Sequence, residues 1–266
     1  MKIIFLGVGA GEFYPAMLCN CSICSKYRTE GKILGFSSIL IDDQYLVDCP
    51  LGTALNFALF KIKPKFPFHI LITHSHQDHF APSESISVRK NSEDQVFTYM
   101  NQTTLNLLKH YQKFNRFYSI SPETKVIAPF KKIRLNQDDF AIPILANHDK
   151  FYNEECLNFI FKIKNKTLLY ASDTGWYDNE KTWQEILKHK YDIVILEFSF
   201  IDKINTHMNY KHFLKFIEHL RTNQCMKSKT QIIATHLHLH QLNNEKTTLL
   251  EEAGVKIAYR GMHCEC

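Results

Sequence analysis

The chain has 266 residues, of which 45% are hydrophobic and 22% charged, with a mild net charge of +5 and 8 cysteines. This length can bury a full two-layer core, and no linker, repeat or low-complexity block divides it, so we expect one domain over residues 1–266. No apolar run approaches the roughly 20 residues needed to cross a bilayer, and Lys2–Gly7 is too short for a secretory signal. Clustered cysteines fit a reducing compartment better than a disulfide framework, so we expect a cytoplasmic protein without membrane contact.

Strand-like and helix-like runs are mixed along the chain. Strands are expected at Lys2–Gly7, Ser37–Ile41, Tyr45–Asp48, Phe68–Thr73, Gln95–Tyr99, Phe140–Ala146, Leu157–Lys164, Thr167–Ser172, Asp192–Phe198, Thr230–Thr235 and Val255–Tyr259. Helices are expected at Leu51–Phe60, Thr103–His110, Glu180–Lys188, Lys211–Leu220 and Asn244–Glu252. Strands dominate each half and helices come late in each, which is compatible with two mixed sheets between helices.

The most informative run is Thr73–His79, which follows an apolar strand. It holds three imidazoles and one carboxylate, from His74, His76, Asp78 and His79. These donors suit zinc, manganese or iron, and they are too many for one closed site. The first two histidines point the same way if strand geometry persists, and the other two residues lie a turn further on. The run therefore indicates two adjacent metal ions, against the alternative of a histidine-rich surface loop.

By its H-x-H-x-D-H run the chain resembles the metallo-β-lactamase superfamily. Three later segments, Ala146–Asp149, Leu168–Gly175 and Ile232–His236, occur in the order that this superfamily uses. Each alone is weak, because a single strand-end Asp or His is more often a cap or a surface polar residue. The resemblance implies an α/β fold, a four-layer αββα sandwich. It also implies one metal on His74, His76 and His148, a second on Asp78, His79 and His236, and Asp173 as the bridge between them.

Two divalent ions, Zn²⁺ or Mn²⁺, roughly 3.5–4 Å apart would polarise a phosphoryl or carbonyl oxygen and hold a hydroxide at neutral pH. The chain gives no sign of a covalent nucleophile, so the expected activity is metal-dependent hydrolysis, with Asp78 counted in the catalytic set. Asp48 ends a strand where the superfamily carries a buried acid, and we expect it to orient a ligand.

A second metal-type cluster is the run Cys19, Cys21 and Cys24, within a loop of about residues 16–28. Three thiols this close suit a structural Zn²⁺, against the alternative of cysteines packed as small hydrophobes. Within the superfamily this C-x-C-x-x-C run resembles the PhnP-like phosphodiesterases, in which a later histidine completes the site. The spacing in that group would put this histidine at position 239, which is a leucine in this chain. His240 is therefore favoured over His238 as the fourth zinc ligand, and Cys264 and Cys266 are the alternative candidates for it.

The resemblance also implies a histidine that faces the metals without binding them, here His207, as a phosphate contact and general acid. An exposed histidine at a helix start is the alternative. Lys150 could contact a substrate phosphate or be solvated.

The favoured substrate is a small cyclic or nucleotide-like phosphodiester, attacked by metal-bound hydroxide. The alternatives are an RNA-processing nuclease, an ester or thioester hydrolase, or a non-hydrolytic metal-binding protein. Nucleic acid is not favoured, because no basic arm is present. The oligomeric state is left open, with a homodimer as one alternative. Residues 89–118 are expected to form either a dimer contact or part of the wall of the substrate site.

Overall fold

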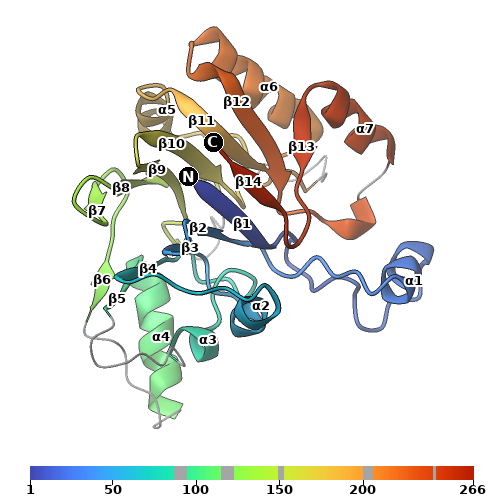
Figure 1. Ribbon diagram of the computed structural model, residues 1–266, viewed down its shortest axis with the longest axis horizontal. Helices are drawn as coiled ribbons and strands as arrows, with labels where there is room; N and C mark the ends of the chain where they lie inside the picture. The colour runs from blue at the N-terminus through green and yellow to red at the C-terminus, as the bar shows by residue number, and fades with distance from the viewer. Residues whose placement is uncertain (87–94, 115–122, 149–152, 200–205, 242–243) are drawn as a thin grey trace.

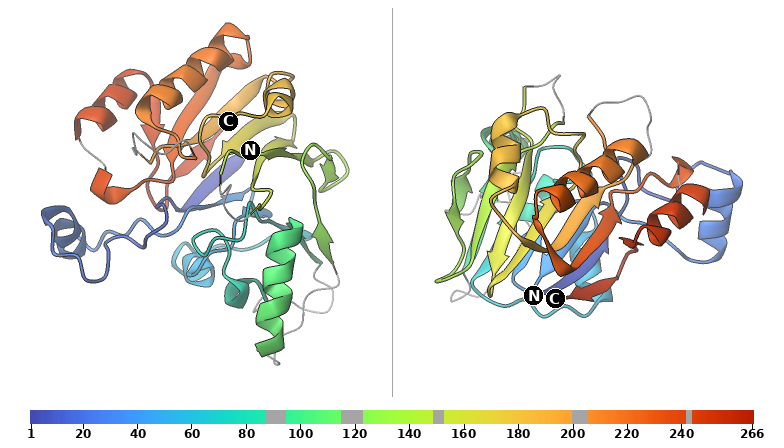
Figure 2. Two further views of the ribbon diagram at one scale, coloured as in Figure 1. Left: turned by 180° about the vertical axis from the view of Figure 1, so that it is seen from behind. Right: turned by 90° about the horizontal axis from the view of Figure 1, so that it is seen from above.

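The computed structural model describes residues 1–86, 95–114, 123–148, 153–199, 206–241 and 244–266. Two seven-stranded sheets stack on one another, and helices lie outside each of them (Figures 1 and 2). The mixed α/β fold with a helix–sheet–sheet–helix order is therefore confirmed. No helix among the described residues is long and apolar enough to cross a membrane.

The first sheet is antiparallel at one side and parallel at the other. Its strands, in spatial order, are β14 (His263–Glu265), β1 (Lys2–Gly7), β2 (Ser38–Ile41), β3 (Tyr45–Val47), β4 (Phe68–Leu71), β5 (Val96–Met100) and β6 (Thr124–Val126). Pairing is antiparallel from β14 to β3 and parallel from β3 to β6.

The second sheet has the same mixed character. Its strands, in spatial order, are β13 (Val255–Ile257), β12 (Met226–Thr235), β11 (Tyr191–Glu197), β10 (Lys166–Ala171), β9 (Leu157–Ile163), β8 (Phe140–Leu145) and β7 (Ile133–Arg134). Pairing is parallel from β13 to β10 and antiparallel from β10 to β7. Every residue of β11 is buried, as expected of a parallel strand that is covered on both faces.

The helices divide between the two outer faces. The first sheet carries α2 (Thr53–Leu59), α3 (Pro82–Ile86) and α4 (Gln102–Phe114), and the second carries α5 (Glu180–Ile186), α6 (Tyr210–Thr222) and α7 (Asn244–Glu252) (Figure 1). A short 3₁₀ turn, η1, spans Leu239–Gln241. In all three views α1 (Ser22–Thr29) stands at the periphery, away from both sheets (Figures 1 and 2).

The main elements lie where the sequence predicts them, and so do the short strands β3 and β13. The strands β6, β7 and β14 and the helices α1 and α3 are not predicted, because each is short and lacks a clear apolar period. Strand β12 begins at Met226, four residues before the expected start, because its polar first half still pairs with β11 across an irregular register.

One edge of the stacked sheets collects the ends of several strands. Strands β10, β11 and β12 are parallel, and β8 runs with them because β9 is antiparallel to both β8 and β10. The first sheet reaches the same edge, since the Leu157 N–H at the start of β9 donates to the Thr73 carbonyl just beyond β4, at 2.9 Å. Residues that follow β4, β8, β10 and β12 therefore meet at this edge.

Candidate metal centre

The seven predicted metal ligands meet at this strand-end edge. Three of them adjoin strand ends of the second sheet, namely His148 after β8, Asp173 after β10 and His236 after β12. The other four come from the loop after β4. All seven are buried except His76, which is half-buried. Asp173 and His236 have positive φ angles of 53° and 54°, a conformation that Asp and His adopt more readily than most residues and that concentrates at functional sites.

One group of candidate ligands consists of His74, His76, His148 and Asp173. His74 Nε2 lies 3.3 Å from Asp173 Oδ2. His148 Nε2 lies 3.2 Å from His76 Nδ1, and His148 Nδ1 lies 3.1 Å from Asp173 Oδ1. The side chains assigned from sequence to the first metal are thus in contact.

A second group consists of Asp78, His79, Asp173 and His236. His79 Nε2 lies 3.3 Å from both His236 Nε2 and Asp173 Oδ2, and 3.4 Å from Asp78 Oδ2. Asp173 belongs to both groups, which is the position required of a bridging carboxylate.

The spacing of these atoms fits metal ions. Two ligand atoms each about 2.0–2.1 Å from one tetrahedral metal lie about 3.3 Å apart, which matches the nitrogen–nitrogen and nitrogen–oxygen distances of both groups. His74 Nε2 and Asp173 Oδ1 are buried, and the polar atoms that face them belong to other candidate ligands or to His207. Imidazoles facing one another at this distance, with carboxylates between them, form a donor set suited to divalent transition metals.

Asp48 supports this arrangement from the end of β3. It is fully buried, with φ at 63°. One carboxylate oxygen lies 2.7 Å from His79 Nδ1, and the other accepts the Thr73 N–H at 2.8 Å. The contact fixes which nitrogen of His79 faces the metal group.

Two buried acids in the site were missed by sequence reasoning. Glu197, the last residue of β11, lies 2.6 Å from His207 Nδ1 and 3.4 Å from His236 Nδ1. The acid that ends an apolar strand was a usable signal, the same that identified Asp173. Glu154 accepts the Ser75 N–H at 3.0 Å and Asn101 Nδ2 at 2.7 Å. No local pattern marks Glu154, because its partners are distant in sequence.

His207 lies beside the metal groups, in the loop before α6. Its Nδ1 is 2.6 Å from Glu197 Oε1 and 3.2 Å from Asp173 Oδ1, which leaves Nε2 on the far side of the ring. Burial would lower the pKa of His207, but the carboxylates of Glu197 and Asp173 outweigh it and raise that pKa to about 11. Lys150, the other predicted substrate contact, lies outside the described residues.

A cavity of about 210 Å³ opens over these side chains. Its lining includes candidate ligands from both groups and His207, together with Ser199, His238 and the loop Ala10–Glu12 that follows β1. A substrate in this cavity would meet both metal groups and His207 at once.

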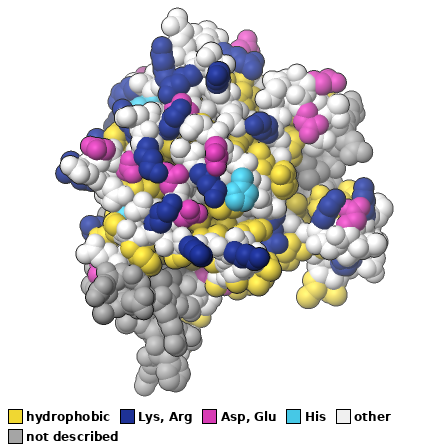
Figure 3. All heavy atoms as spheres, viewed as in Figure 1, with side chains coloured by type: hydrophobic (Ala, Val, Ile, Leu, Met, Phe, Trp, Pro, Cys, Tyr) yellow, Lys and Arg dark blue, Asp and Glu magenta, His cyan; other side chains and the backbone are white. Residues whose placement is uncertain are grey.

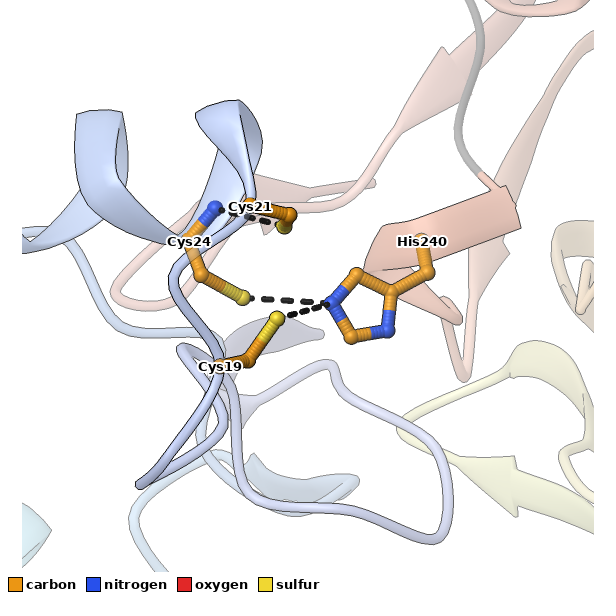
Figure 4. A group of neighbouring side chains, drawn as sticks. All are labelled: Cys19, Cys21, Cys24 and His240. Atoms are coloured by element: carbon orange, nitrogen blue, oxygen red, sulfur yellow. Dashed lines mark hydrogen bonds between the residues drawn. The ribbon is translucent and has the colours of Figure 1, made fainter.

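The three cysteines and His240 form a separate cluster near α1 (Figure 4). His240 Nε2 lies 3.2 Å from Cys24 Sγ and 3.5 Å from Cys19 Sγ, and the four ligand atoms are mutually within 4.8 Å. Thiolate and imidazole ligands of one tetrahedral zinc have about this spacing. His238 points elsewhere, with Nε2 2.9 Å from the Tyr14 hydroxyl. Of the two histidines considered, His240 is therefore the one placed as fourth ligand.

Comparison with known proteins agrees with this geometry. A family model described as beta-lactamase superfamily domain matches residues 44–252, a range that contains all seven candidate ligands. A diphosphatase from the PhnP family is 22% identical, with a TM-score of 0.75 over 100% of this chain and 97% of that one. Zn²⁺-bound PqqB from Methylobacterium extorquens is 15% identical, with a TM-score of 0.76 over 100% of each chain. Human tRNase Z, short form, is 16% identical, with a TM-score of 0.66 over 100% and 99%. At these identities the solved structures show a shared fold. No curated protein matches the chain.

Proposed function

This chain belongs to the beta-lactamase superfamily, and we propose from that premise that it is a metal-dependent hydrolase acting on a small cyclic or nucleotide-like phosphodiester. Two divalent ions held by the two ligand groups would supply Lewis acidity and activated water. The carboxylate of Asp173 would hold the ions together, and Asp78 is oriented by the Gly11 N–H, which donates to its Oδ2 at 2.9 Å.

The observation that carries the proposal is the placement of His207. Its Nδ1 lies 2.6 Å from the fully buried Glu197 carboxylate, so the ring is oriented with Nε2 on its far side, where that nitrogen can carry a proton. A phosphodiester with an unactivated alcohol needs a proton on the leaving oxygen, and His207 Nε2–H can donate it within the same cavity.

The cavity favours a small substrate. Its volume of about 210 Å³ is below the roughly 300–1,000 Å³ typical of drug-sized ligand sites. On the face shown in Figure 3, which carries both chain termini, Lys and Arg side chains are interspersed with Asp and Glu. The small cavity volume matches a compact phosphodiester better than a long nucleic acid.

The test is hydrolysis of bis(p-nitrophenyl) phosphate by purified protein supplied with Mn²⁺ or Zn²⁺. The control is Asp173→Asn, because Asn tolerates the positive φ at this position. Turnover in the native protein, lost by at least about 10³-fold in the control, is expected. Absence of turnover in metal-loaded native protein would contradict the proposal.

The role of His207 is tested by leaving-group dependence. For a 2′,3′-cyclic nucleotide, His207→Ala should lower kcat by about 10²–10⁴. For bis(p-nitrophenyl) phosphate the loss should be much smaller, because nitrophenolate leaves without a proton. Equal losses on both substrates, or loss of active-site metal in the variant, would show that His207 does something else.

A further inference from the structure

One side of the cavity is formed by residues that belong to none of the candidate metal groups. Glu12 follows β1, His238 follows the candidate ligand His236, and both line the cavity. Neither is among the side chains grouped for metal binding in the described chain. We call Glu12, His238 and the Tyr14 side chain that connects them the Glu12 wall.

The backbone that carries Glu12 is fixed relative to the metal groups. The Gly9 N–H donates to the Gly35 carbonyl at 2.7 Å, and the Ala10 N–H donates to the Leu237 carbonyl at 3.1 Å. A Cβ at Gly9 would lie 2.7 Å from the Gly35 carbonyl oxygen, so this approach requires glycine. The Gly11 N–H then donates to Asp78 Oδ2. Glu12 therefore comes one residue after a direct contact with a candidate metal ligand.

Tyr14 holds the side chain of His238 in place. Its side chain is fully buried, and its hydroxyl lies 2.9 Å from His238 Nε2. Burial, together with the neighbouring Glu12 carboxylate, raises the pKa of Tyr14 well above its usual value, so the hydroxyl keeps its proton and its hydrogen bond. The wall therefore presents the Glu12 carboxylate beside a hydrogen-bonded pair formed by Tyr14 and His238.

The Glu12 carboxylate weakens the binding of an anionic substrate through charge repulsion. Glu12 is exposed at the cavity, where its carboxylate neighbours the Tyr14 hydroxyl. It would repel a phosphate and any additional anionic group that a substrate carried. That cost is offset only when the substrate places hydrogen-bond donors against the carboxylate, whose two oxygens match the two O–H groups of a neighbouring diol.

Resting on the function proposed above, we propose that Glu12 is a specificity-determining residue. It accepts hydrogen bonds from neighbouring hydroxyl groups on the alcohol part of the phosphodiester, while Tyr14 and His238 hold that wall in place. The substrate class is thereby narrowed to phosphodiesters of a polyol or sugar, and phosphodiesters of plain alkyl alcohols are disfavoured.

The experiment compares two esters that release the same chromophore, glyceryl p-nitrophenyl phosphate and propyl p-nitrophenyl phosphate. They differ in the two hydroxyl groups alone, and a blank without protein corrects for spontaneous cyclisation of the glyceryl ester. The measured quantity is the ratio of kcat/KM for glyceryl over propyl. It is expected to be about 10 or more in the native protein, because a carboxylate hydrogen bond to a substrate hydroxyl has about that effect.

Glu12→Gln should lower this ratio by about 10-fold, mainly through KM for the glyceryl ester, and Glu12→Asp should restore part of it. Glu218→Gln, which alters an exposed carboxylate on α6, is the matched control and should keep the native ratio. Equal kcat/KM for both esters in the native protein, or a native ratio retained by Glu12→Gln, would overturn the inference and leave the proposed hydrolase intact. Turnover of neither ester by metal-loaded protein would overturn the proposed function and this inference with it.

Discussion

The two metal-type clusters differ in what holds their side chains in place. The first, which we call the strand-end cluster, lies between two packed sheets, and its residues adjoin strand ends that the core fixes independently. The cysteine cluster lies on a peripheral loop whose first two thiols are half-buried and exposed, respectively. Arg28 adds hydrogen bonds to the Cys19 and Ala16 carbonyls, but this loop has little apolar core of its own. Removing metal should therefore affect chemistry at the first cluster and local folding at the second.

The largest effect is expected from Asp173→Asn, because one side chain serves both metal groups. Catalytic turnover should fall by at least about 10³-fold and both active-site metals should bind more weakly. The fold should persist, since the residues around Asp173 are held by strands β8, β10 and β12. Metal analysis together with thermal unfolding checks this. Collapse of the thermal transition would show that the strand-end cluster also depends on metal for folding.

Cys21→Ser is expected to affect the cysteine cluster and its loop while the active site keeps its metals. About one metal per chain should be lost while the two active-site metals stay bound, because the clusters share no ligand. Backbone amides of residues 16–30 should exchange with deuterium much faster, and those of β10 to β12 should not. Lys26→Ala, an exposed change on the same helix at a side chain that pairs with Glu30, is the control. An unchanged metal content in Cys21→Ser would refute the zinc assignment.

The same contrast explains which parts could be predicted from sequence. The residues of the strand-end cluster follow apolar strands, and local patterns reveal where such strands end. The sequence favours His240 over His238, but the physical reason is visible only in the structure, where the 3₁₀ turn Leu239–Gln241 directs the two rings to different partners. Helix α1 was missed because it has few apolar residues and is held by caps and side-chain contacts.

The interactions between sequence-distant polar residues were equally unpredictable. Glu154 contacts Ser75 in the metal loop, Asn101 after β5 and Thr104 in α4, at separations of 50 or more residues. No spacing rule connects these positions. The sequence thus predicts which side chains reach the site edge, whereas the hydrogen bonds that orient them come from the tertiary structure.

A moderate loss of metal affinity is expected when the hydrogen bonds of Glu154 to the metal loop are weakened. Glu154→Gln replaces one acceptor oxygen by a donor that faces other donors, so the loop from His74 to His79 should lose its fixed position. Affinity for the active-site metals should fall by about 10–100-fold, the usual range for residues that orient ligands. Competition with a chelator measures it, and Co²⁺ spectra report the ligand geometry. Glu155→Gln, its exposed neighbour, is the matched control. Equal affinities in the two variants would limit Glu154 to a packing role.

The smallest effect concerns His69, a buried residue of the inter-sheet core with no part in either cluster. Its ring stacks on Phe97 and Tyr99. Burial, reinforced by the Lys125 cation, lowers the pKa of His69 to about 4 from its usual value near 6.5. Between these values the unfolded chain takes up a proton that the folded chain does not, so this contribution to stability is complete above about pH 6.5 and is lost as the pH falls toward 4.

His69→Phe removes this titration and keeps a ring in the stack. Between pH 7.5 and 5, its unfolding midpoint should fall by roughly 2–4 °C less than that of the native protein. His263→Phe, at an exposed position of β14, should follow the native protein. Because every variant retains the histidines of both metal clusters, their protonation cancels in the comparison. Parallel pH curves for native protein and His69→Phe would mean that His69 is not held neutral, and that acid sensitivity belongs to the metal clusters alone.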